Sequence, residues 1–306
     1  MEWWQAIILG LVEGITEYLP ISSTGHLILT AELLGLGETP QQKASVDAFN
    51  IVIQGGAILA VLGLYRERVA QIIRGLLGRD VVGRRLAVNL LIAFLPAAIF
   101  GVMLDEPIER LLFSATPVLT ALFIGGVFMI ALDYWKVRPL RRAEAAVDTG
   151  GHDVDSLSWK AALIIGLLQC VAMWPGTSRS MMTIAGGVIV GLRPRAAAEF
   201  SFLLGLPTLG GACVYKLAKN IKQAQETGGP NLFQELGGVN VALGIVFATA
   251  SAALAVRWLV GFLNRHGLAA FGWYRIALTA VMAALVVAGL VDVGGPSRAV
   301  LESGPE

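Results

Sequence analysis

The sequence predicts an all-α polytopic membrane protein with six transmembrane helices, two re-entrant helix-loop-helix hairpins and an inverted-topology repeat. Three observations predict this fold class. Of the 306 residues, 56% are hydrophobic and 15% are charged, whereas about 25% of residues are charged in soluble domains. Six apolar runs are close to the length that a helix needs to cross a hydrocarbon core of about 30 Å. Two further apolar stretches are interrupted by proline and polar residues.

The six uninterrupted runs are the expected transmembrane helices. They are Ala48–Tyr65, Leu86–Leu104, Ala115–Trp135, Ala196–Tyr215, Val239–Val256 and Leu268–Val291. The N-terminus lacks the basic region and cleavage site of a secretory signal, so the first apolar stretch is expected to stay in the mature protein. The net charge of +1 lacks the clustered basic excess of a nucleic-acid-binding protein, so no nucleic acid partner is expected.

Charged residues beside the spans predict their orientation. Basic residues crowd the segments at about 66–85 and 136–158, and both are therefore expected to be cytoplasmic loops. Asp105 and both chain termini then fall outside. Three lysines oppose the rule, because they would also lie outside: Lys216, Lys219 and Lys222.

Three residues inside apolar segments have plain expected roles. Arg275 lies near the inner end of the last span and is expected to snorkel toward water. Cys170 and Cys213 lack metal-site spacing and are expected to be small buried hydrophobic residues, with no disulfide framework.

The two interrupted stretches, Trp3–Gly35 and Trp159–Leu192, break at Pro20 and Pro175. Proline stops a helix, and the serines and threonines that follow are good caps for a new one. If both stretches crossed the membrane, the two basic loops would lie on opposite sides. Each stretch is therefore expected to be a re-entrant hairpin, the first entering from outside and the second from the cytoplasm.

An internal repeat supports this arrangement. Pro20 and Pro175 are 155 residues apart, and a Gly-hydrophobic-hydrophobic-Glu/Gln pattern precedes each. The chain is expected to be one membrane domain, 1–306, in which repeat one covers about 1–135 and repeat two about 156–291.

Glu13 and Glu17 are four residues apart before the first break, so they share one helix face. Burying two carboxylates in lipid is expensive, and a shared cation would relieve them. Mg²⁺ or Ca²⁺ suits such oxygen ligands. The alternative is a carboxylate pair at the hairpin mouth in contact with water.

Ser22, Ser23, Thr24 and Gly25 follow the first break. Their hydroxyls and free backbone N–H groups lie where a new helix begins, and helix N-termini bind phosphate. His26 follows within one turn and is able to act as acid, base or nucleophile. This segment is therefore a candidate phosphate and catalytic site.

Arg179 supplies a positive charge at the second break, with Thr177, Ser178, Ser180 and Thr183 around it. A guanidinium matches phosphate oxygens with two parallel hydrogen bonds. The alternative is a structural salt bridge from this arginine to one of the two glutamates.

Together the two breaks offer carboxylates for a metal, donors for phosphate, an arginine and a histidine. This set suits transfer of a phosphoryl group to water. The substrate is expected to be a lipid-linked pyrophosphate, because a site among spanning helices admits a long chain sideways from the membrane.

The run from Leu11 to His26 and the run Pro175-Gly176-Thr177-Ser178-Arg179-Ser180 resemble the bacterial undecaprenyl-pyrophosphate phosphatase family, also called the bacitracin-resistance protein family. The likeness covers nearly the whole chain. It implies metal-dependent hydrolysis of undecaprenyl pyrophosphate to undecaprenyl phosphate and phosphate, which recycles the carrier for peptidoglycan and gives bacitracin resistance. It also implies a bacterial inner-membrane location and a site open to the periplasm.

The resemblance carries roles onto individual residues. Glu13 and Glu17 become metal-associated carboxylates, Ser23 and His26 catalytic candidates, and Ser178, Arg179 and Thr183 phosphate contacts. The nucleophile stays open between Ser23, His26 and a metal-bound water. Met181 departs from the family pattern, in which a glycine commonly follows Ser180.

A transporter or flippase of a prenyl phosphate lipid is the competing class, because inverted repeats with broken helices also typify secondary transporters. Such a protein needs neither a nucleophile nor a metal pair, so the cluster of Glu13, Glu17 and His26 favours an enzyme. The expected partners are the prenyl pyrophosphate substrate and membrane lipids, and the sequence is compatible with a homodimer.

Overall fold

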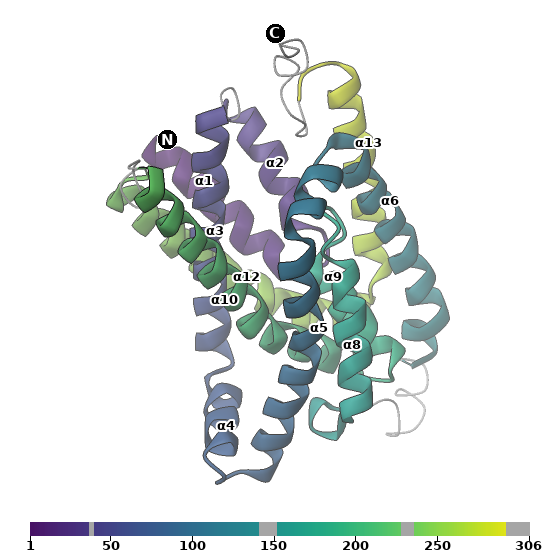
Figure 1. Cartoon of the computed structure of the whole chain (residues 1–306). Coiled ribbons are helices and arrows are strands. Elements are labelled where there is room, and N and C mark those ends of the chain that lie inside the picture. The colour runs from purple at the N-terminus through teal and green to yellow at the C-terminus, as the bar shows by residue number, and fades with distance from the viewer. Residues whose placement is uncertain (37–39, 141–151, 228–235, 292–306) are drawn as a thin grey trace.

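The computed structural model describes residues 1–36, 40–140, 152–227 and 236–291 (Figure 1). Every regular element within these ranges is helical. The α-helices are α1 (Trp3–Glu17), α2 (Ser23–Leu33), α3 (Pro40–Leu64), α4 (Arg66–Leu76), α5 (Val81–Leu112), α6 (Ala115–Leu132), α8 (Trp159–Val171), α9 (Arg179–Ile189), α10 (Pro194–Thr227), α12 (Gly238–His266) and α13 (Ala269–Val287). A π-helical turn, η1 (Asp133–Val137), continues α6, and a 3₁₀ turn, η2 (Val154–Ser156), precedes α8.

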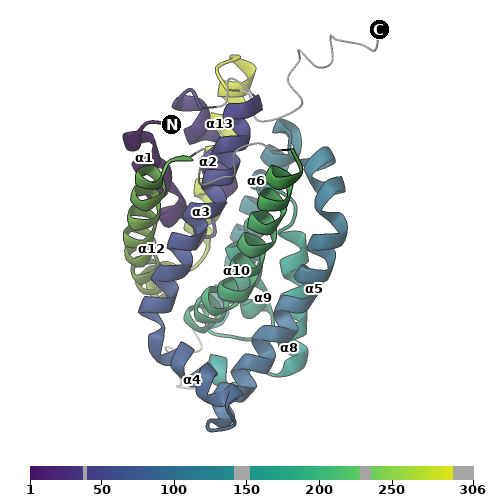
Figure 2. The same cartoon turned by 60° about the vertical axis from the view of Figure 1, so that its left-hand side comes forward.

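Six helical segments of the described chain are long and apolar enough to cross a membrane: Ser45–Leu64, Val81–Ile108, Ala115–Leu140, Pro194–Lys219, Gly238–Leu263 and Ala269–Val287. Each overlaps one of the six spans expected from the sequence, so the expected spans are confirmed. The long helices run side by side, with α3 in contact with α10 and α12 and with α5 against α10 (Figure 2).

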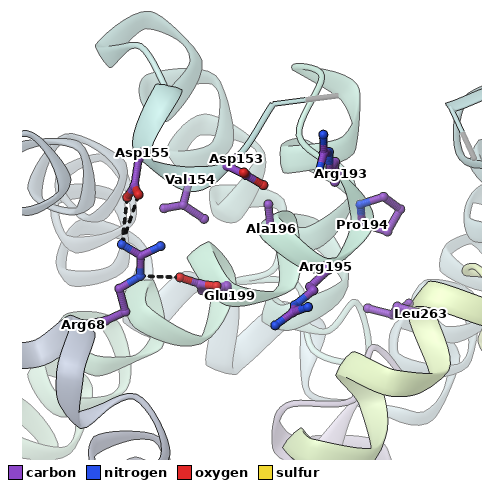
Figure 3. A pocket seen from close by; sticks show the side chains of 10 residues that line it. All are labelled: Arg68, Asp153, Val154, Asp155, Arg193, Pro194, Arg195, Ala196, Glu199 and Leu263. Atoms are coloured by element: carbon purple, nitrogen blue, oxygen red, sulfur yellow. Dashed lines mark hydrogen bonds and ion pairs between the residues drawn. The ribbon is translucent and has the colours of Figure 1, made fainter. Parts of the chain in front are cut away.

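Side-chain contacts assign the connecting segments to two ends of the bundle. Arg68 pairs with Asp155 at 2.9 Å and with Glu199 at 2.8 Å, which joins the segments after α3, before α8 and at the start of α10 (Figure 3). Lys219 lies 3.4 Å from Asp105. Lys219, one of the three lysines that opposed the charge rule, therefore shares an end of the bundle with the C-terminal part of α5.

The segment 66–85, expected to be a loop, begins instead with α4, an amphipathic helix. Gly75 of α4 lies against the backbone of Gly83 and Arg84 at the start of α5, where a Cβ would not fit. The segment between α3 and α5 is therefore partly helical, with its arginines on the polar face of α4, and its cytoplasmic location stays a prediction.

Both interrupted stretches are helix-loop-helix units, as expected. We call Trp3–Leu33 hairpin one and Trp159–Ile189 hairpin two. The Gln5 side chain donates to the Leu34 carbonyl at 3.2 Å, and the backbone N–H of His152 donates to the Gly191 carbonyl at 3.0 Å. Each stretch therefore returns to the region where it began.

Small residues let each hairpin approach a long helix closely. In hairpin one, a Cβ at Gly10 would meet the Gly244 backbone of α12, and a Cβ at Gly14 would meet Ala248 and Ser251 of α12. In hairpin two, a Cβ at Gly166 would meet the Ala93 backbone of α5. Such close helix crossings are typical of membrane interiors. These close crossings hold α1 against α12 and α8 against α5.

Candidate active site

The turns of the two hairpins end in the same backbone form. Ser22 caps α2 with φ of 73° and accepts from the Gly25 N–H at 3.4 Å. Ser178 caps α9 with φ of 78° and accepts from the Met181 N–H at 3.3 Å. Among the described residues, these two are the only ones other than glycine with a left-handed φ, a conformation that non-glycine residues rarely adopt.

Glu17, at the end of α1, joins the two turns. Its Oε2 accepts from the Ser23 hydroxyl at 2.7 Å, and its Oε1 accepts from Arg179 Nη2 at 2.9 Å. Glu17 and Arg179 are largely buried, with side chains 5% and 11% exposed. Charged hydrogen bonds are strong when water is excluded. The two breaks in the sequence thus meet in one polar cluster.

One N–H group of the Arg179 guanidinium has no hydrogen-bond acceptor among the described residues. Its Nη1 donates to the Ser201 carbonyl at 3.0 Å, and its guanidinium lies 5.4 Å from the centre of the Tyr18 ring. Its Nε is buried without a hydrogen-bond partner among the described residues. The salt bridge kept as an alternative reading therefore exists, and the unpartnered N–H still points to an anion that this site would bind.

Glu13 is fully buried, and neither of its carboxylate oxygens has a hydrogen-bond partner among the described residues. The reading of Glu13 and Glu17 as a pair in contact with water is thus wrong. An unpaired buried carboxylate is expensive, so these oxygens fit a cation as partner. No group of three or more acidic, histidine or cysteine side chains with metal-site spacing occurs in the described parts of the chain. The side chains therefore offer the two carboxylates, and other ligands would come from substrate or water.

His26 lies on α2 but is not bonded to either glutamate. Its Nδ1 lies 2.7 Å from the Ser22 carbonyl and its Nε2 lies 2.7 Å from the Tyr274 hydroxyl. Since a carbonyl only accepts, Nδ1 carries the proton in neutral His26, and Tyr274 donates to Nε2. Sequence analysis missed Tyr274, because no local pattern marks a contact over 248 residues.

Two predicted phosphate contacts lie in packed positions. Ser180 is fully buried and donates to the Leu19 carbonyl at 2.8 Å, which ties hairpin two to the turn of hairpin one. Thr183, also fully buried, donates to the Arg179 carbonyl at 2.9 Å, and its Oγ1 lies 2.6 Å from Ser201 Oγ. The remaining two predicted contacts are Thr24, in the first turn of α2, and Thr177, buried directly before Ser178.

Arg275 does not snorkel, so that expectation was wrong. Its side chain is fully buried. It donates to four main-chain carbonyls, those of Ala121, Leu122, Gly176 and Thr177. The sequence suggested an inner-end position, but packing of α13 against α6 places this arginine beneath the turn of hairpin two.

The fold and the cluster define a multi-pass membrane protein whose buried polar site combines carboxylates, hydroxyls and an arginine. The chain belongs to the family described as bacitracin resistance protein BacA, whose family model matches residues 6–281.

Several curated relatives are similar over almost the whole chain. An undecaprenyl-diphosphatase of Sorangium cellulosum is 45% identical over 92% of this chain and 86% of its own length. One of Azotobacter vinelandii is 45% identical over 95% of this chain and 98% of its own. A protein of Rhodospirillum rubrum named undecaprenyl-diphosphatase 2 is 46% identical over 94% and 96% respectively.

Proposed function

We propose that this chain hydrolyses undecaprenyl pyrophosphate to undecaprenyl phosphate and inorganic phosphate. The observation that carries the proposal is the buried contact of Glu17 with both Ser23 and Arg179, which joins the two hairpins in one site. The relatives named undecaprenyl-diphosphatase support the same substrate. The activity recycles the lipid carrier for peptidoglycan and gives bacitracin resistance.

Arg179 and the N-termini of α2 and α9 are the groups that we assign to the pyrophosphate. The unpartnered Nε of Arg179 supports this assignment. The backbone N–H groups that follow Ser22 and Ser178 add donors, since helix N-termini attract anions. Ser178 Oγ lies 3.0 Å from Ser180 Oγ and is able to turn toward a phosphate oxygen.

Glu13 and Glu17 are the residues that would hold a divalent cation, Mg²⁺ or Ca²⁺. The two orphaned oxygens of Glu13 support this role. When bound, such a cation neutralises pyrophosphate charge and polarises the phosphoryl oxygens.

Ser23 is better placed than His26 to give its proton to Glu17, since its hydroxyl already donates to that carboxylate at 2.7 Å. We therefore favour Ser23 Oγ as the group that attacks the terminal phosphorus. Its proton passes to Glu17, and the bond from phosphorus to the bridging oxygen breaks, which leaves undecaprenyl phosphate and a phosphoserine. Water then hydrolyses the phosphoserine to free serine and phosphate. His26, with Nε2 as an acceptor, is the base for that water.

The repeat and the hairpins support an inverted arrangement with two re-entrant segments. The matched turns at Ser22 and Ser178 are one line of support. The reciprocal packing is another, because α1 lies against α12 of repeat two and α8 lies against α5 of repeat one. The arginines around Arg68 support a cytoplasmic location for that end of the bundle. Hairpin one then opens to the exterior of a bacterial inner membrane.

The transporter alternative is less well supported, because the relatives carry the name of a phosphatase and Glu17 contacts a hydroxyl suited to attack. The homodimer stays a prediction, and light scattering of the protein in detergent tests it.

Phosphate release from undecaprenyl pyrophosphate by the purified full-length chain tests the proposed function. We expect release that requires a divalent cation and that EDTA abolishes. A Glu17→Ala variant of normal size-exclusion profile is expected to lose most but not all of its activity, while Arg68→Ala, which removes a similar arginine–glutamate pair at the other end, is expected to be active. No release from folded wild type with Mg²⁺ or Ca²⁺ would contradict the proposal and favour lipid transport.

A further inference from the structure

One turn of α13 reaches both hairpins through two consecutive residues. We propose that Tyr274 and Arg275 are positioning residues of the phosphatase site: Tyr274 holds His26 of hairpin one, and Arg275 holds the turn of hairpin two from which Arg179 projects. This inference rests on the proposed function and names two residues outside both sequence motifs.

Arg275 acts as a cross-tie between α6 and hairpin two. Its Nη2 donates to Gly176 at 2.8 Å and its Nη1 to Thr177 at 3.1 Å. On the other side its Nη2 donates to Ala121 at 3.0 Å and its Nε to Leu122 at 3.2 Å. All four of these acceptors are backbone carbonyls, so within the described parts of the chain the guanidinium holds backbone in place.

The turn of hairpin two, to which Arg275 donates, has an unfavourable backbone conformation. Gly176 has φ of 92° and Ser178 has φ of 78°. Backbone in such a conformation persists only where the surroundings hold it. The carbonyls of Gly176 and Thr177 belong to the two peptide units directly before Ser178, the cap of α9. Their position therefore sets where α9 begins and where Arg179 points.

Space for Arg275 comes from α6. A Cβ at Gly125 would collide with the Arg275 guanidinium. A Cβ at Gly126 would meet the Gly272 backbone, and one at Gly272 would meet the Gly126 carbonyl. The two helices thus cross closely next to this arginine, which gives the cross-tie a rigid base.

Tyr274 makes the matching contact with hairpin one. Its hydroxyl lies 2.7 Å from His26 Nε2, and the two rings stack with centroids 5.7 Å apart and planes 2° apart. The contact orients the imidazole and stabilises the tautomer with a free Nε2 acceptor. Tyr274 is 45% exposed, so its hydroxyl is able to leave Nε2 when a water or phosphate group arrives.

Helix geometry explains why neighbours in sequence serve different hairpins. Consecutive residues project about 100° apart around a helix with 3.6 residues per turn. Arg275 therefore points into the bundle while Tyr274 points along its edge.

The experiment compares Tyr274→Phe, Arg275→Lys and Gly125→Ala with wild type, using undecaprenyl pyrophosphate hydrolysis by the full-length chain in detergent. Tyr215→Phe, a similarly exposed tyrosine on α10, is the control. We expect Tyr274→Phe to lower kcat by about tenfold with little change in KM and to shift the acid limb of its pH profile, as loss of an oriented base does. We expect Arg275→Lys and Gly125→Ala to lower kcat and raise KM, because a misplaced turn weakens both binding and reaction.

Two readouts are independent of activity and separate this inference from the proposed function. In a background without His152 and His266, diethyl pyrocarbonate should modify His26 faster in Tyr274→Phe than in wild type. Hydrogen exchange should increase over 174–180 in Arg275→Lys at a temperature where the fold is intact. Wild-type exchange and modification rates, with wild-type kinetics, would overturn the inference. Losses of activity that only follow the loss of folded protein would overturn it as well. If wild type were inactive but the variants still showed faster modification of His26 and faster exchange over 174–180, the proposed function would be contradicted and the positioning contacts would be supported.

Discussion

Ser22 and Ser178 occupy equivalent places in turns that share backbone form, cap geometry and the length of the helix that follows, 11 residues in each case. The side chains that surround them differ. Hairpin one carries Glu13, Glu17 and His26, whereas Gln169 stands near the start of the second break and Arg179 follows its cap. The comparison teaches that two turns of the same backbone form carry different side chains: carboxylates and a histidine flank the first, and an arginine follows the second.

The largest expected effect is loss of the reacting groups of hairpin one. Ser23→Ala should lower kcat by about a thousandfold or more, because the attacking hydroxyl is absent, while His26→Ala should leave more residual activity. Rapid quenching of the reaction with undecaprenyl pyrophosphate labelled in its terminal phosphate should trap labelled phosphoserine in wild type. Ser23→Ala with the kinetics of wild type would show that water or His26 attacks instead.

Loss of the guanidinium in hairpin two should affect both substrate binding and the reaction. Arg179→Lys keeps a positive charge but loses the planar fork, so KM should rise by about tenfold and kcat should fall. The inhibition constant of inorganic phosphate, measured for the variant and for wild type, reports the same weakening of phosphate binding at equilibrium. Unchanged inhibition by phosphate would mean that Arg179 serves only the salt bridge with Glu17.

Cation binding should depend on the carboxylates of hairpin one and not on the arginine of hairpin two. Mg²⁺ or Ca²⁺ should raise the thermal midpoint of wild type, and Glu13→Gln should abolish that increase, since ligand binding stabilises only the state that holds it. Arg179→Ala, in the other hairpin, should retain the increase. An equal increase in Glu13→Gln would place the cation elsewhere.

Ser22→Ala and Ser178→Ala test the shared backbone form. Each removes a helix cap and should destabilise the fold by about 1 kcal/mol, as measured by thermal unfolding in detergent. Similar losses at both positions would support the equivalence of the turns. A loss at one position alone would show that the turns are alike in form but not in what they stabilise.

The smallest effect is expected at the opposite end of the bundle. Arg68 bridges Asp155 and Glu199 beside a polar cavity of about 470 Å³ (Figure 3). Because this ion-pair network is partly exposed, Arg68→Ala should change stability by less than about 1 kcal/mol and leave hydrolysis within about twofold of wild type. A large loss of hydrolysis would mean that this end takes part in the reaction.

The sequence predicted the elements whose signals are local. Apolar runs reveal the six spans, and proline followed by capping residues reveals both hairpins. The salt bridge of Arg179 to Glu13 or Glu17 was only an alternative to a phosphate contact, and the structure shows it with Glu17. Contacts between residues far apart in the chain leave no local pattern in the sequence. Tyr274 and Ser201 reach the site across long stretches of chain, and the separation of His26 from Glu17 depends on the turn at Ser22.

Arg275 shows why local reasoning failed. A lone arginine near a helix end usually reaches toward water. Here Gly125 of α6 leaves space for the guanidinium, and the carbonyls of the second turn accept its hydrogen bonds in the interior. Two segments far from Arg275 in the chain, α6 and the second turn, make that environment, and no local pattern around Arg275 signals it.

The most direct test of one site built from two hairpins is a double-mutant cycle on kcat/KM with Glu17→Ala, Arg179→Ala and the double variant. If the two residues act in one site, the double variant should be little worse than the more damaging single variant. Losses that multiply in the double variant would show two residues acting independently, and would contradict the account.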